Sequence, residues 1–235
     1  MRRRLIPVLA ASILFAGTGF SAAAGKDDLS GLPCDRSVTT HPAGQPKIPR
    51  DYPVEQRIGQ YRLFIPWAYL LGRPDPWWLN CPQRFDWTSI AFWIPDLQAP
   101  ERDLSGKPFR PPVESNRPAP GPDGWVLRID RLRPIRDEDT SIPEMVGNSR
   151  NHLWKGAQEV PEGTLTRAGE NYWFHIGKDE DALIQCLPKS NCRMYLDLKD
   201  YRLRVEALYA RAGVGQFDLV LTGLRKLLVD WQVGK

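Results

Sequence analysis

The chain has 235 residues, of which 42% are hydrophobic and 26% are charged, with 32 Lys and Arg against 28 Asp and Glu. So large a hydrophobic fraction excludes an intrinsically disordered chain, and four cysteines are too few for a disulfide-dense miniprotein. The length suits one domain, or at most two small ones, and is ample to bury a core.

The first 24 residues predict a signal peptide. Three arginines at positions 2–4 precede a largely apolar stretch at 5–20, and alanines at 22–24 form a cleavage site that makes Gly25 the expected mature N-terminus. A membrane anchor is the alternative, but the apolar stretch is short for a span of about 20 residues. Because three arginines leave with the leader, the net charge of +4 becomes +1, which argues against nucleic-acid binding. We expect a periplasmic protein that does not span the membrane after cleavage.

The four cysteines all follow the leader. An even number of cysteines in an exported protein predicts disulfides, and four allow three pairings. Cys186 and Cys192 enclose five residues of turn composition between two apolar runs, which favours a bridge across a hairpin and leaves Cys34 to pair with Cys81. A zinc site is the alternative, but the spacing exceeds the usual ~2–4 residues and no histidine lies nearby.

The first half of the mature chain predicts few regular elements. Residues 25–60 are polar and rich in proline, so we expect an irregular arm. The apolar run at 61–71 contains Pro66, which favours an edge strand or a bulge. Residues 88–94 predict a buried strand, and residues 95–124, with eight prolines, predict a long surface loop that could insert into a partner.

The second half predicts a sheet. Residues 125–132 alternate apolar and charged side chains, as in a half-exposed strand, and residues 136–156 are expected to be irregular. Short connections between the next apolar runs predict an antiparallel meander. Its four strands are expected at 171–176, 182–187, 193–198 and 203–209. In the last strand, one side carries Leu203, Val205, Ala207 and Tyr209, and the opposite side carries Arg204, Glu206 and Leu208.

The chain ends in a predicted amphipathic helix over residues 217–231. Its apolar stripe follows helical spacing and consists of Phe217, Val220, Leu221, Leu224, Leu227, Leu228 and Trp231. Such a stripe needs a surface to cover, and the preceding meander provides one. We therefore predict an α+β fold, mainly an antiparallel meander covered by the C-terminal helix, with long Pro-rich loops and a single domain over 25–235.

The sequence offers no catalytic constellation. It has no G-x-S-x-G elbow, no H-E-x-x-H motif and no glycine-rich phosphate loop before a helix, and its three histidines are scattered. We therefore expect no enzyme, no metal site and no cofactor. The alternative is an enzyme of unrecognised type that uses His175 or acidic turns.

Two clusters are candidate partner-binding residues. Trp77 and Trp78 lie between prolines just before Cys81, where exposed indole rings could anchor a protein or stack on a sugar. Asp137, Glu138 and Asp139 could face a basic partner. Packing of the tryptophans beneath a nearby loop, and solvation of the acids in a turn, are the alternatives.

The order of elements resembles that of the small periplasmic immunity proteins encoded beside type VI secretion effectors. The resemblance involves residues 64–70 (FIPWAYL), 92–97 (FWIPDL), 186–192 (CLPKSNC) and 227–231 (LLVDW). It implies a binding protein that occludes a cognate antibacterial toxin, the effector, in the periplasm. A cell-envelope carbohydrate or peptidoglycan-binding module that uses Trp77 and Trp78, or an envelope structural protein, is the alternative.

Overall fold

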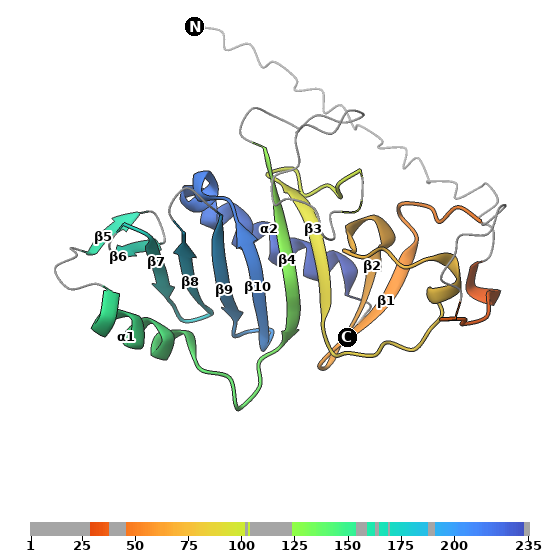
Figure 1. Cartoon of the computed structure of the whole chain (residues 1–235), viewed down its shortest axis with the longest axis horizontal. Coiled ribbons are helices and arrows are strands. Elements are labelled where there is room, and N and C mark those ends of the chain that lie inside the picture. Colours follow the sequence, from red (N-terminus) through yellow and green to blue (C-terminus); the bar gives the residue numbers. More distant parts are fainter. Residues whose placement is uncertain are drawn as a thin grey trace, which may run out of the picture.

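The computed structural model describes residues 29–37, 46–101, 103, 124–153, 159–162, 165–168, 170–187 and 191–232. Within them, eight strands form an antiparallel sheet of order β3-β4-β10-β9-β8-β7-β6-β5, and β1 and β2 form a separate hairpin (Figure 1). The strands of the large sheet are β3 (Thr88–Ile94), β4 (Trp125–Pro134), β5 (Glu159–Glu162), β6 (Leu165–Ala168), β7 (Tyr172–Ile176), β8 (Glu180–Cys186), β9 (Cys192–Leu198) and β10 (Leu203–Tyr209). The other elements are β1 (Pro53–Ile58), β2 (Tyr61–Pro66), helices α1 (Ile142–Leu153) and α2 (Phe217–Trp231), and the 3-10 turns η1 (Leu29–Gly31), η2 (Trp67–Tyr69), η3 (Pro76–Trp78) and η4 (Arg211–Gln216).

The predicted α+β class is confirmed. Strands β7, β8, β9 and β10 pair with one another in chain order, as the short connections between them predict. Two earlier strands extend this meander, because β4 pairs with the free edge of β10 and β3 pairs with β4. The large sheet therefore joins the two halves of the chain.

Helix α2 covers one face of the large sheet (Figure 1). It has the predicted bounds, and all seven residues of the predicted stripe are buried. The β1–β2 hairpin packs against the C-terminal end of α2, where Leu63 forms a bridge with Gln232 and the Tyr69 ring meets Trp231 edge-on at 5.0 Å. The sheet, α2 and the hairpin thus share one core. None of the described helices is long and apolar enough to cross a membrane.

The opposite face of the sheet carries α1 at one end, which corrects the expectation that 136–156 is irregular. Ile142 and Val146 of α1 pack with Phe174 of β7 and Leu183 of β8. Ser141 caps the helix, because its Oγ accepts a hydrogen bond from the Glu144 N–H at 3.3 Å. The helix is stabilised by this cap and by the packing of its first apolar residues on β7 and β8, and not by an apolar stripe along its whole length.

Two further expectations are corrected or fall outside the described residues. The arm expected at 25–60 contains a regular strand, β1, which pairs with β2 along its whole length. Strands β5 and β6 were not predicted. The leader at 1–24 and most of the Pro-rich loop, residues 102 and 104–123, lie outside the described residues.

Gly213 in η4 is a position where the fold depends on the absence of a side chain. A Cβ atom there would lie 2.5 Å from Cζ2 of Trp125, whose ring is buried and whose indole N–H donates to Gln216 Oε1 at 2.8 Å. Because the ring cannot move freely, we expect Gly213→Ala to lower the free energy of unfolding by about 1–3 kcal/mol in urea titration. Gly215→Ala, in the same turn with no atom within 4 Å, should leave stability unchanged, and equal effects would contradict the packing argument.

Candidate partner-binding surface

The predicted tryptophan pair lies on a segment that a disulfide and short backbone bonds hold in place. Cys34 is joined to Cys81 and Cys186 to Cys192, the two pairings that the sequence favours. Next to the first bridge, Asp35 N–H donates to the Trp77 C=O at 3.0 Å, and Cys81 N–H donates to the Trp78 C=O at 3.1 Å. The segment that contains the tryptophans is therefore fixed to the N-terminal segment that carries Cys34.

The two tryptophans have different environments. Trp78 is 41% exposed, whereas Trp77 is half-buried and its buried indole N–H has no acceptor among the described residues. Of the pair, Trp78 is the side chain that a partner can reach. Phe85, which no sequence pattern singles out, is 59% exposed on the connection from η3 to β3.

Trp78 and Phe85 both line a groove between β1 and residues 79–86, which we call the β1 groove. Its larger hollow, of about 920 Å³, is lined by β1 and the 79–86 segment, and an overlapping hollow of about 490 Å³ includes both aromatic side chains. Phe85 also stacks on Trp87, with ring centroids 5.4 Å apart. The groove thus has exposed aromatic side chains at its border.

Arginine side chains give the β1 groove a positive character. Arg36, Arg57 and Arg84 line it, and the opposing acids are Glu55 and Asp86. Both acids are already paired. Hydrogen bonds from Arg62 and Arg57, each at 2.8 Å, hold the pKa of the Glu55 carboxyl below its ordinary value.

The second acid is paired outside the groove, and two of the three lining arginines make no ion pair with the described residues. Asp86 forms an ion pair with Arg136 at 3.0 Å. Arg36 and Arg84 make no ion pair with the described residues, and Arg84 is exposed. An anion that enters the groove therefore finds an available guanidinium group.

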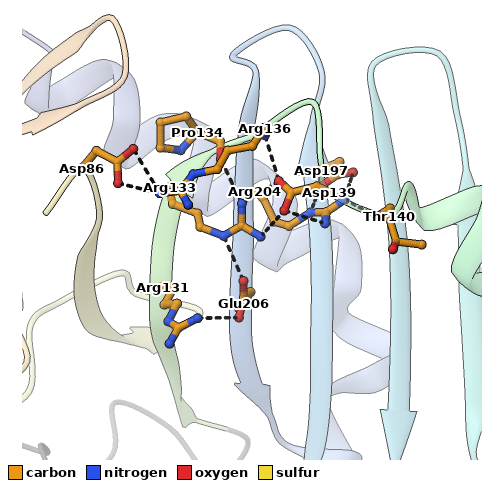
Figure 2. A network of polar contacts seen from close by, with 10 residues as sticks. All are labelled: Asp86, Arg131, Arg133, Pro134, Arg136, Asp139, Thr140, Asp197, Arg204 and Glu206. Atoms are coloured by element: carbon orange, nitrogen blue, oxygen red, sulfur yellow. Dashed lines mark hydrogen bonds and ion pairs between the residues drawn. The ribbon is translucent and has the colours of Figure 1, made fainter.

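The acidic triplet does not act as one cluster (Figure 2). Asp137 and Glu138 are exposed in the connection from β4 to α1, whereas Asp139 turns inward onto the sheet. Its carboxylate accepts two hydrogen bonds from Arg133, at 2.6 and 2.9 Å, and one from the Arg136 N–H at 2.8 Å. Asp137 and Glu138 alone remain available to a partner.

A network of ion pairs continues from Asp139 across the sheet face opposite α2 (Figure 2). Arg133 also donates to Glu206 at 3.0 Å, and Arg204 lies 3.8 Å from Asp139. Arg204 is 2% exposed and binds Asp197 of β9 through two hydrogen bonds of 2.6 and 2.8 Å. The pKa of Arg204 is raised, first by its hydrogen bond with Asp197.

The Arg204–Asp197 pair was not predicted, because strand alternation alone gives the side of β10 on which Arg204 lies but neither its partner nor its burial. The register of β9 and β10 is the feature of the sequence that indicates this pair. A four-residue connection between residues 198 and 203 places residue 197 opposite residue 204, so that opposite charges face each other across the strands. The burial of Arg204 also depends on the connection from β4 to α1, because Arg204 donates to the Thr140 C=O of that connection at 3.0 Å.

The structure places the tryptophan pair and the acidic triplet in different regions. The triplet follows the C-terminal end of β4, and the tryptophans belong to η3, where Trp78 lines the β1 groove. One ion pair, Asp86–Arg136, links the two connections. Among the residues that the structure describes, no group of three His, Cys, Asp or Glu side chains could hold a metal ion.

Asp139 should make stability depend on pH in acid. Hydrogen bonding to Arg133 lowers the pKa of its carboxyl from 3.8 to about 2. A folded-state pKa below the unfolded one stabilises the protein above about pH 4, and this stabilisation is lost as the pH falls toward about 2. In urea titrations across this range, the stability difference between the unsubstituted protein and Asp139→Asn should shrink toward zero. Glu138→Gln, at the exposed neighbour, should show no such trend, and a constant difference for Asp139→Asn would contradict this prediction.

No protein-family model matches the sequence, and the search of curated proteins gave no match. Among solved structures, the chain is similar to an immunity protein of the Stenotrophomonas maltophilia type IV secretion system, with 13% sequence identity and a TM-score of 0.47. The similarity covers 82% of this chain and 100% of that chain. At this identity and TM-score, the likeness does not assign a function.

Proposed function

We propose that this chain is an exported binding protein that occludes a cognate antibacterial toxin in the periplasm, in the manner of an immunity protein. The resemblance to immunity proteins encoded beside type VI effectors suggests this role, and the predicted leader supports export. The two disulfides support the same compartment, because disulfides persist in oxidising environments.

The exposed aromatic pair in the β1 groove is the observation that carries the proposal. Trp78 and Phe85 remain exposed at 41% and 59%, although the Cys34–Cys81 disulfide holds their segment in place. Interfaces gain most of their binding energy from a few such anchors, and a fixed anchor loses little entropy when it binds. Inhibition by occlusion requires a surface of this kind and no reacting group.

Co-expression with a toxin encoded by an adjacent gene tests the proposal. We expect the chain to restore growth of cells that carry the toxin in their periplasm, and to bind the purified toxin in calorimetry. Trp78→Ala with Phe85→Ala should weaken binding by at least about tenfold. Leu219→Ala with Val229→Ala removes two apolar side chains of similar exposure from α2 and should leave affinity unchanged. Absence of rescue and binding would refute the proposal.

A carbohydrate or peptidoglycan-binding module is the second candidate, because an exposed indole ring such as that of Trp78 also stacks on sugar rings. Sedimentation with purified sacculi separates the two functions. Retention that is lost in Trp78→Ala would favour the sugar-binding module, and a protein that stays in the supernatant would exclude it.

A further inference from the structure

The outer edge of β1 is accessible from the β1 groove. Ile58 and Tyr61 face each other across a two-residue turn, so every second residue of β1 directs its backbone groups toward β2. Arg57 and Glu55 direct theirs away from β2. Both residues line the groove, so this edge of the hairpin forms one of its walls.

A side chain already occupies part of this edge in the manner of a strand. Gln83 Oε1 accepts a hydrogen bond from the Arg57 N–H at 2.6 Å, and Gln83 Nε2 donates to the Arg57 C=O at 3.0 Å. The amide thus makes the two bonds that a neighbouring strand would make. Gln83 belongs to an exposed connection, so an incoming backbone can replace its amide without unfolding any regular element.

The charges around this edge select the kind of chain that can lie there. Of the three arginines that line the groove, Arg57 is paired with Glu55, whereas Arg36 and Arg84 make no ion pair with the described residues. Both lining acids are already paired with arginines. An acidic segment is therefore attracted and a basic segment repelled. Trp78 and Phe85 at the border provide contact area for apolar side chains, which alternate with the acidic ones in an extended chain.

We propose that the β1 groove binds an extended acidic peptide segment of the partner, which pairs with the outer edge of β1 as an added strand. This inference rests on the proposed function, since it names the part of the toxin that the chain recognises. Strand addition draws affinity from backbone hydrogen bonds and specificity from alternate side chains, and both are provided here by the edge and by the arginine and aromatic side chains.

A displayed library of random peptides of about 12 residues, selected on the full chain, tests the inference without the toxin. We expect the enriched sequences to alternate acidic with apolar or aromatic residues. Arg84→Glu should weaken the selected peptides by about tenfold, and Gln83→Ala should strengthen them, because no amide has to be displaced. The matched control is Arg193→Glu, an exposed arginine on β9, which should change nothing.

Backbone methylation distinguishes strand addition from side-chain contact alone. Methylating every second peptide amide should abolish binding in one register and leave it nearly unchanged in the other, because alternate amides face opposite ways in a strand. Equal effects in both registers, enrichment of basic or uncharged peptides, binding of chitotetraose instead of peptides, or no binding peptide at all would overturn the inference. None of these results depends on the toxin, so growth rescue remains a separate test of the proposed function.

Discussion

Replacing Arg204 with methionine is expected to lower the free energy of unfolding by about 3–5 kcal/mol, the largest effect of any single substitution proposed here. Arg204 is 2% exposed, and its guanidinium donates to the Asp197 carboxylate and the Thr140 C=O and lies 3.8 Å from the Asp139 carboxylate. Methionine fills most of the volume but leaves the Asp197 charge buried without a counter-ion. The loss therefore comes from an unpaired carboxylate rather than from a cavity.

Two control variants separate the charge from the packing. Adding Asp197→Leu to Arg204→Met removes the buried carboxylate that has lost its counter-ion. We expect the double variant to recover most of the lost stability, since apolar pairs often replace buried ion pairs without loss of stability. Lys226→Met breaks an exposed ion pair of similar length on α2, Lys226–Asp230 at 2.7 Å, and should cost no more than about 0.5 kcal/mol. If the double variant were less stable than Arg204→Met in urea titration, the argument would be wrong.

The elements that the sequence predicts well are those whose stabilising contacts are local. Helix α2 has a complete stripe over four turns, and the last four strands are joined by connections too short for any pairing but antiparallel. The partner of β4 is different, because β10 lies about 70 residues away and no local pattern specifies that pairing. The sequence therefore predicts that β4 is a strand, but its neighbours in the sheet depend on contacts between distant parts of the chain.

Helix α1 shows why some elements escape prediction. Among the side chains of α1 that the structure describes, Ile142 and Val146 are buried and Met145 is partly buried, all within the first two turns, so periodicity over the helix is weak. A local signal does exist, because Ser141 and Glu144 have the spacing of a capping box, with a proline in the first turn. The helix forms because β7 and β8 present an apolar site for its first turns.

The candidate site was predictable only in part, for the same reason. Composition identified the Trp77–Trp78 pair, but which ring faces solvent depends on the disulfide and on the packing of η3. Asp139 follows two exposed acids and is indistinguishable from them in sequence, yet Arg133 draws it into the sheet network. Arg84 and Phe85 have no distinguishing pattern at all, and only the fold brings them to the edge of β1.

Removing the Cys34–Cys81 bridge by serine substitution of both residues is expected to lower the free energy of unfolding by about 4 kcal/mol. The bridge closes a loop over a sequence separation of 47, and closing a longer loop removes more entropy from the unfolded chain. The matched control is the double serine variant of Cys186 and Cys192, whose separation of 6 predicts a loss of about 2 kcal/mol. Backbone pairing of β8 with β9 already places those two cysteines opposite each other.

The two double variants should also differ in where the structure loosens. Without its bridge, the segment around Cys34 is held by a few hydrogen bonds. Among them are those from Asn80 Nδ2 to the carbonyls of Leu29 and Leu32, each at 2.8 Å. Hydrogen exchange should therefore increase in the η3 region and the 79–86 segment, and peptide binding in the β1 groove should weaken. Equal losses of stability in the two variants, or an unchanged exchange rate beside Trp78, would show that the bridge does not hold the groove in place.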